Sequence, residues 1–185
     1  MTPHPHHATK PDGHPGERTE GATLRLVAWE ITRNCNLNCV HCRAAATRGP
    51  YEGELDTDAC LRLLDQIART GDPIVILTGG EPLLRPDIFD IARYGTDKGL
   101  RVVMAPNGTL VTPENAAKMA AAGIQRISIS IDGASAEFHD RFRGVDGAYA
   151  GAMQGIKNAG AAGIEFQINT TITPVSYTHL RAHET

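Results

Sequence analysis

Short apolar runs alternate with amphipathic segments along most of the chain. The apolar runs predict β-strands at residues 24–32, 73–80, 100–108, 124–133 and 164–173. Apolar residues at helical spacing predict helices at residues 55–71, 86–99, 112–123 and 146–163. Strands that alternate with helices form parallel sheets through right-handed crossovers. The pattern therefore predicts an α/β fold, which is either a doubly wound sheet or a barrel of β/α units.

The two ends of the chain depart from this pattern. Residues 1–22 are rich in Pro, Gly, His and charged residues, so we expect a disordered tail rather than a specific metal site. Residues 175–185, VSYTHLRAHET, back-translate to the transposon-end adapter of sequencing libraries. We interpret residues 174–185 as non-native, and residues 23–173 as the N-terminal part of a barrel that is truncated after about its fifth strand.

Composition narrows the class of protein. The 185 residues are 41% hydrophobic and 21% charged, with a net charge of −3, so we expect no nucleic-acid partner. We also expect no membrane partner, because no apolar run reaches the roughly 20 residues that a spanning helix needs, and the N-terminus has no apolar signal core. The predicted location is cytoplasmic, where clustered cysteines stay reduced and bind metals.

Three cysteines follow the first predicted strand at once, in the spacing C-x3-C-x2-C: Cys35, Cys39 and Cys42. A structural zinc site takes four protein ligands. His41 adjoins Cys42 too closely to join the same tetrahedron, and Cys60 is better interpreted as a core residue of the first predicted helix. Three thiolates on a [4Fe–4S] cluster leave one iron open to a small molecule. We therefore favour a catalytic cluster, and a non-catalytic zinc-binding module stays as a distant alternative.

The C-x3-C-x2-C spacing, with GGEP at residues 79–82, SIDG at 130–133 and FHDRFRG at 138–144, resembles the radical S-adenosylmethionine (SAM) superfamily. The resemblance is to the branch whose members carry extra clusters in a C-terminal extension. It implies a partial (β/α) barrel of the radical SAM type, with a [4Fe–4S] cluster and SAM as cofactors. A second [4Fe–4S] cluster would lie in a missing C-terminal part.

The resemblance also implies a role for each matching residue. Cys35, Cys39 and Cys42 would hold three irons, and the fourth iron would bind SAM. The implied SAM contacts are His41 against adenine; Gly79, Gly80 and Glu81 at the methionine ammonium, with Pro82 fixing the turn; Ser130 at the ribose; and Arg143 at the carboxylate. Asp132 and Asn107 would face the same rim, although turn chemistry explains both equally well.

Longer stretches, such as PIVILTGGEPLLRPDIFDIARYGTDKGLRVVMAPNGTLVT, resemble the heme b synthase family of the siroheme-dependent heme pathway. This resemblance implies oxidative decarboxylation of two propionates of iron-coproporphyrin III, with an electron donor such as ferredoxin or flavodoxin. Arg33, Arg43, Arg48 and Arg85 follow the first two strands and would suit a substrate rich in carboxylates. A peptide or protein maturase of the same branch remains the alternative.

Overall fold

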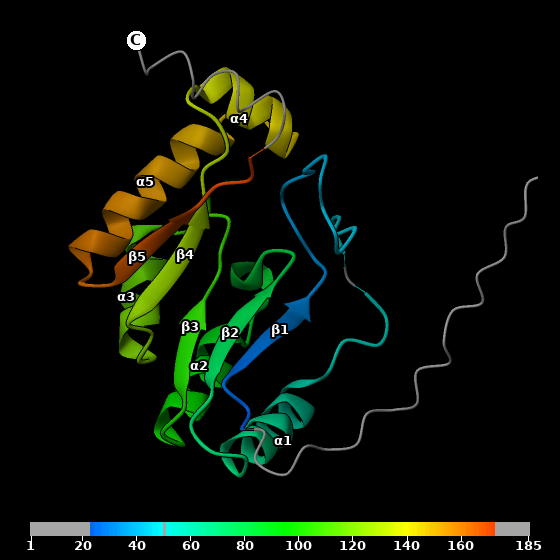
Figure 1. Ribbon diagram of the computed structural model, residues 1–185, viewed down its shortest axis with the longest axis vertical. Coiled ribbons are helices and arrows are strands. Elements are labelled where there is room, and N and C mark those ends of the chain that lie inside the picture. Colours follow the sequence, from blue (N-terminus) through cyan, green and yellow to red (C-terminus); the bar gives the residue numbers. More distant parts are fainter. Residues whose placement is uncertain (1–22, 50, 173–185) are drawn as a thin grey trace, which may run out of the picture.

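The computed structural model describes residues 23–49 and 51–172, which form one five-stranded sheet with helices. The strands are parallel and follow the order of the chain: β1 (Leu26–Thr32), β2 (Ile74–Gly79), β3 (Arg101–Met104), β4 (Arg126–Ser130) and β5 (Glu165–Asn169). The helices are α1 (Thr57–Ala68), α2 (Ile88–Asp97), α3 (Pro113–Ala121), α4 (Ala136–Arg143) and α5 (Ala148–Ala161), with a 3-10 turn η1 (Pro82–Leu84). Figure 1 shows the curved sheet. The predicted α/β fold is confirmed.

One face of the sheet forms the core with the helices. Alternate strand residues point to this face, and the strand register aligns them in rows such as Trp29, Leu77 and Met104. Leu77 and Met104 are fully buried, as are Ile127 and Ile129 of β4. This apolar layer holds the strands in register, so the loops at their carboxyl ends meet at one edge of the sheet.

The opposite face of the sheet is more polar and more exposed. It carries Glu30 at the end of β1, Ser130 at the end of β4 and, next to Ser130 in the register, Asn169 of β5. Arg126 and Glu165 form an exposed ion pair across β4 and β5 at 2.5 Å. In a partial barrel this face is the interior, so the strands provide polar groups to that interior near their carboxyl ends.

The sheet is not closed, because β1 and β5 are its two edges. Phe166 and Ile168 of β5 share a face with the buried Ile127 and Ile129, yet they are 45% and 50% exposed. The open edge at the fifth strand agrees with the prediction of a partial barrel. The tail predicted at residues 1–22 and the non-native segment predicted at 174–185 lie outside the described residues. Within residues 23–49 and 51–172, no helix is long and apolar enough to cross a membrane.

Two short elements were not predicted from the sequence. The 3-10 turn η1 follows β2, and α4 follows β4. Ser135 caps α4 by accepting a hydrogen bond from the backbone N–H of Phe138, and Gly144 ends the helix in the left-handed conformation. By contrast, the start of α3 agrees with the helix predicted at residues 112–123: Thr112 is its N-cap and Pro113 its first residue.

Candidate functional site

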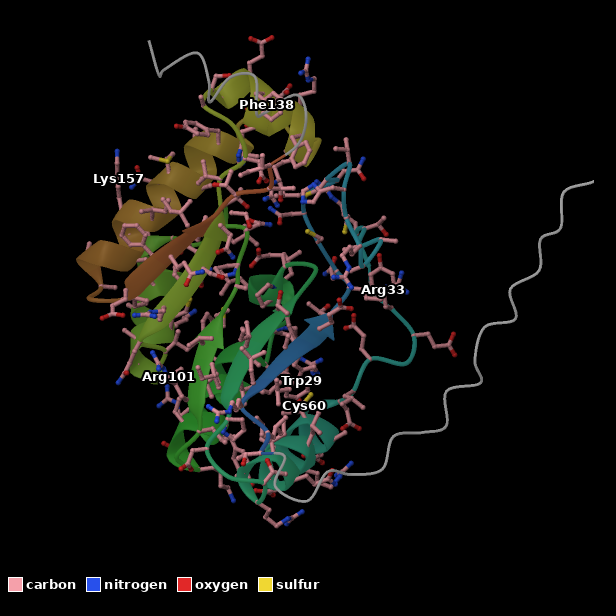
Figure 2. All side chains as sticks on the ribbon, in the orientation of Figure 1. Trp29, Arg33, Cys60, Arg101, Phe138 and Lys157 are labelled. Carbon is pink, nitrogen blue, oxygen red and sulfur yellow. The ribbon has the colours of Figure 1, made fainter. Side chains whose placement is uncertain are left out.

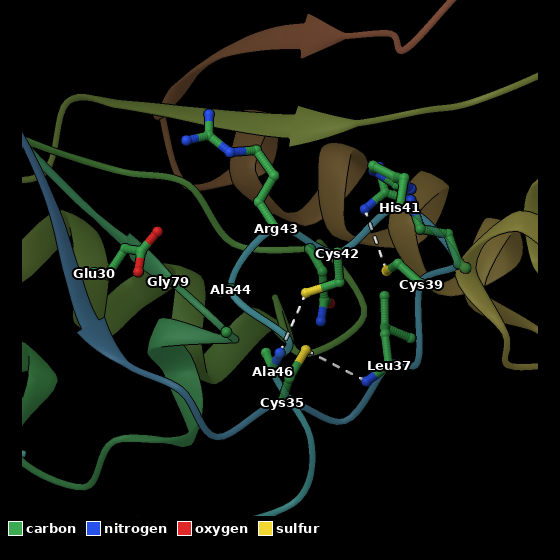
Figure 3. A pocket seen from close by; sticks show the side chains of 13 residues that line it. Glu30, Cys35, Leu37, Cys39, His41, Cys42, Arg43, Ala44, Ala46 and Gly79 are labelled. Carbon is green, nitrogen blue, oxygen red and sulfur yellow. Dashed lines mark hydrogen bonds between the residues drawn. The ribbon is translucent and has the colours of Figure 1, made fainter. Parts of the chain in front are cut away.

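The loop of residues 33–49, here called the cysteine loop, leaves the carboxyl end of β1 and borders a cavity of about 270 Å³. Cys35, Cys39 and Cys42 all line this cavity, together with Gly79 and Gly80 from the end of β2. Figure 3 shows the three sulfur atoms around the same space. The structure therefore brings together the cysteines and the glycine pair that the sequence singled out.

Each of the three sulfur atoms accepts a hydrogen bond. The donors are the backbone N–H of Leu37 to Cys35 Sγ at 3.4 Å, the backbone N–H of Ala46 to Cys42 Sγ at 3.3 Å, and Arg143 Nη1 to Cys39 Sγ at 3.7 Å (Figure 3). N–H donors stabilise negative charge on sulfur and orient it, which suits thiolate ligands. Burial raises the pKa of the Cys35 thiol, and the Leu37 N–H opposes this shift.

The thiols surround the cavity and do not converge on a point. Within residues 23–49 and 51–172, no three His, Cys, Asp or Glu side chains are arranged to hold one metal ion. In a cubane cluster each thiolate binds a different iron, so ligands around a cavity fit a cluster better than they fit a single zinc ion. Cys60 is fully buried on α1 and does not line the cavity (Figure 2), as expected of a core residue.

Gly79 and Gly80 let two backbone segments approach closely. The N–H of Gly80 donates to the Thr32 carbonyl oxygen at 2.7 Å, and the N–H of Glu81 donates to the Asn34 carbonyl oxygen at 2.7 Å. A Cβ at Gly79 would collide with the carbonyl oxygen of Thr32, and one at Gly80 with that of Asn34. Glycine is therefore required for the GGEP motif at residues 79–82 to pack against the start of the cysteine loop.

Glu81 was predicted to contact SAM, but its side chain is buried and does not line the cavity. Its side chain is fully buried and accepts hydrogen bonds from the backbone N–H groups of Leu83 at 2.9 Å and Asn107 at 2.6 Å. Burial raises the pKa of the carboxyl to about 7, and the two hydrogen bonds oppose that shift. The carboxylate thus joins η1 to the loop after β3, while Pro82 is buried at the start of η1. A contact between Glu81 and SAM remains a prediction.

Asn107 belongs to a network that the sequence did not reveal. Its Nδ2 donates to Asn36 Oδ1 at 2.8 Å, and its Oδ1 accepts from the backbone N–H of Thr109 at 2.9 Å. Asn36 Nδ2 in turn donates to Thr109 Oγ1 at 2.8 Å. Together with Glu81, these side chains connect the cysteine loop, the GGEP motif and the loop after β3. Asn107 also lines the cavity.

Three residues on or after β4 were predicted to lie near SAM, and of these Arg143 lines the cavity whereas Ser130 and Asp132 do not. Ser130 lies on the polar face of the sheet and does not line the cavity. Asp132 is fully buried and accepts from Arg143 Nη2 and from the backbone N–H of Thr171 at 2.6 Å. Asp132 therefore holds α4 and the segment after β5. Arg143 lines the cavity, and its ion-pair partner is Asp132.

His41 lines the cavity and stacks on Phe142 of α4, with ring centroids 4.4 Å apart. Burial, together with the nearby Arg143, lowers the pKa of His41, although Asp132 acts in the opposite direction. A flat, mostly neutral ring at the rim would suit the predicted contact with adenine, which remains a prediction.

The four arginines predicted to face a carboxylate substrate have different surroundings. Arg33, Arg43 and Arg48 are exposed, and Arg43 lines the cavity. Arg85 does not belong with them, because it is buried and paired with Asp87 at 2.7 Å. Its side chain supports the fold.

Glu30 also lines the cavity and was missed from the sequence. Figure 3 shows it reaching in from β1 on the side away from the thiols. A charged residue in the otherwise apolar run LVAWEIT was a signal for it, because alternation places Glu30 on the face opposite Trp29 and Ile31.

Comparisons with known proteins agree with this geometry. The model of the Radical SAM superfamily matches residues 29–183. The "AdoMet-dependent heme synthase" of Methanosarcina barkeri is 59% identical over 149 residues, which are 80% of this chain and 43% of that protein. The "Mycofactocin maturase MftC" of Mycobacterium ulcerans is 38% identical over 149 residues, 80% of this chain and 40% of that protein. This chain thus spans less than half the length of either relative.

Among solved structures, Streptococcus suis SuiB bound to S-adenosylmethionine matches with a TM-score of 0.72 at 19% identity. The match covers 86% of this chain and 36% of that one. At this identity the match shows the fold alone.

Proposed function

Because this chain belongs to the radical SAM superfamily, we propose that it forms the SAM-cleaving part of an enzyme that converts iron-coproporphyrin III to heme b. The observation that carries the proposal is a difference in identity. The chain is 59% identical to a heme synthase and 38% identical to a mycofactocin maturase over stretches of 149 residues each.

The residues around the cavity fit the cofactors of this family. Cys35, Cys39 and Cys42 would hold a [4Fe–4S] cluster, since all three sulfurs line one cavity and accept N–H donors. Gly79 and Gly80 would receive the methionine end of SAM, because their backbone is accessible from the same cavity. When bound, cluster and SAM supply a one-electron cleavage that yields methionine and a 5′-deoxyadenosyl radical.

The proposed reaction removes two carboxyl groups from the porphyrin. In each turnover a hydrogen atom would pass from the β-carbon of one propionate to the 5′-deoxyadenosyl radical, which gives 5′-deoxyadenosine. Carbon dioxide would then be released, one electron would pass to an acceptor, and a vinyl group would remain. Exposed guanidinium groups suit such a substrate because they bind carboxylates in bidentate fashion. Arg43 at the cavity, with Arg33 and Arg48 in the same loop, would supply them.

Three further parts of the proposal concern the whole protein. A ferredoxin or flavodoxin would deliver the electron in the cytoplasm, and a second [4Fe–4S] cluster would lie outside the stretch that matches the relatives. This chain spans 43% of the length of the heme synthase, which leaves room for such a part in that relative.

The alternative is a maturase that modifies a peptide or protein. It is supported by the 38% identity to the mycofactocin maturase. A zinc module is less well supported, because the three thiols surround a cavity and, in the described part of the chain, make no single-ion site.

The test uses the protein expressed from the complete gene and reconstituted with iron and sulfide without oxygen. Supplied with iron-coproporphyrin III, SAM and a reductant, it should form deoxyadenosine and a porphyrin that has lost two carboxyl groups by mass. The Cys39→Ala variant should lose both products. SAM cleavage without porphyrin turnover would favour the maturase, and undiminished cleavage in Cys39→Ala would contradict the cluster assignment.

A further inference from the structure

Arg143 lies between an aspartate and a cysteine of the cysteine loop. Its Nη2 donates to Asp132 Oδ2, and its Nη1 donates to Cys39 Sγ at 3.7 Å. Both charged side chains are shielded from solvent, since the Arg143 side chain is 10% exposed and that of Asp132 is 0% exposed. A buried guanidinium therefore donates a hydrogen bond to one of the three proposed cluster ligands.

Helix α4 holds Arg143 at this place. The carbonyl oxygens of Phe142 and Arg143, at the end of the helix, accept hydrogen bonds from the N–H groups of Val40 and Asn38, both at 3.0 Å. The loop on both sides of Cys39 is thus fastened to the carboxyl end of α4. That end carries a partial negative charge, which disfavours added negative charge nearby. Arg143 lies at the same end and compensates for it.

From this arrangement we propose that Arg143, positioned by Asp132, raises the reduction potential of the cluster that Cys39 would ligate. This inference rests on the proposed function, since it requires the cluster. Reduction adds one negative charge to a cluster, and a buried guanidinium hydrogen-bonded to a ligand sulfur stabilises that charge. Asp132 has the opposite electrostatic effect, because its carboxylate neutralises part of the guanidinium charge. Both are positioning residues, and this role is separate from the predicted contact of Arg143 with the SAM carboxylate.

Asp132 also extends the arrangement beyond the loop. Its Oδ1 accepts from the backbone N–H of Thr171, directly after β5, and its own backbone N–H donates to His139 Nδ1 at 3.0 Å. His139 is buried, and burial together with Arg143 lowers its pKa. The aspartate is therefore held by two elements, α4 and the segment after β5, which favours the direction of the guanidinium toward Cys39.

The test is a redox titration of the reconstituted holoprotein, followed by electron paramagnetic resonance without SAM. The cluster of the cysteine loop is identified as the one whose signal changes when SAM is added afterwards. In Arg143→Gln we expect the equilibrium constant for reduction to fall about tenfold, which is a shift of about 59 mV to more negative potential for one electron. Arg143→Lys should keep most of the wild-type potential, since it keeps the charge.

The opposite sign is expected for Asp132→Asn, since the amide keeps an oxygen that can accept from Arg143 but removes the compensating negative charge, so the potential should rise. Arg141→Gln is the matched control: Arg141 lies on the same helix but is exposed over the ring of Phe138, at 5.7 Å. Its removal should change the equilibrium less than about twofold, because solvent screens exposed charge. Opposite shifts cannot come from a general loss of folding.

Two results would overturn the inference. One is an unshifted potential in Arg143→Gln that still binds the wild-type amount of iron and sulfide. The other is a shift of the same sign in Asp132→Asn and Arg143→Gln. If Arg143→Gln binds no cluster, Asp132→Asn decides alone: a raised potential supports the inference, and an unchanged or lowered potential overturns it. A wild-type protein without a SAM-responsive cluster would instead contradict the proposed function.

Discussion

Two buried arginines of this protein make nearly the same contacts, and yet they belong to different parts of the molecule. Arg85 and Arg143 are each 9% exposed, and each pairs with an aspartate, Asp87 and Asp132 respectively. Each also donates to a cysteine sulfur: Arg85 Nη2 to Cys60 at 3.4 Å and Arg143 Nη1 to Cys39 at 3.7 Å. Burial and charge alone would not tell them apart.

The difference lies in their remaining donors. All three nitrogens of Arg85 have protein partners, including the carbonyl oxygens of Ile31 at 3.1 Å and Leu55 at 2.8 Å. Arg143 Nε is buried and has no hydrogen-bond partner within the described residues, and its side chain lines the cavity. A buried donor without a partner is costly in free energy. We infer that Arg85 stabilises the fold, whereas Arg143 has capacity left for a ligand.

The largest effect that tests this comparison is on stability. Arg85→Met would leave the partly buried Asp87 without its cation and two backbone carbonyls without a donor. Breaking one side of a buried ion pair costs about 3–5 kcal/mol, so urea unfolding should show a loss of that size. The control Arg62→Met, at an exposed arginine of α1, should stay within about 0.5 kcal/mol. A loss below about 1 kcal/mol for Arg85→Met would refute the structural role.

Glu81 extends the comparison, because its buried carboxyl group accepts from two backbone N–H groups, whereas Asp87 and Asp132 each pair with an arginine. Burial would raise the pKa of the Asp87 carboxyl, but the hydrogen bonds from Arg85 and Thr57 hold this pKa below its usual range. For Glu81, burial raises the pKa from 4.5 to about 7. The folded protein then binds more protons than the unfolded chain between these values.

Stability should therefore fall as pH rises from about 4.5 to about 7, by up to about 3 kcal/mol, and this loss should be complete above that range. Urea unfolding at several pH values measures it. In Glu81→Gln the fall over this window should be absent. An equal fall in the variant and the wild type would assign the effect to other groups.

The smallest effect concerns Cys60, the cysteine that Arg85 contacts. Cys60→Ala removes a fully buried sulfur from the core and should cost about 1 kcal/mol, near the average for a point substitution. The iron content after reconstitution should not change, because Cys60 does not line the cavity. Loss of iron in Cys60→Ala would make Cys60 the fourth ligand and revive the interpretation as a four-ligand site.

The regular part of the fold was predictable, because it depends on local patterns. The apolar strands and the amphipathic helices between them were predicted in the right order, although the predicted ends extended beyond the observed ones, as for β3 at Arg101–Met104. Helix α4 was missed because it is short and most of its eight residues are polar, although Phe138 and Phe142 are at helical spacing. Its capping signals, Ser135 and Gly144, were present in the sequence.

The sequence by itself determined which residues carry the chemistry: three thiols at cluster spacing, a glycine pair after the next strand, and a fold that places both at one edge of a sheet. Only the tertiary structure decided the partners of the charged groups. It buries Glu81 between two loops, pairs Arg143 with Asp132, removes Arg85 from the cavity and brings Glu30 into it. The physical reason is that spacing along the chain reflects local backbone geometry, whereas the partner of a buried charge is chosen among groups that meet only when distant strands and loops pack together.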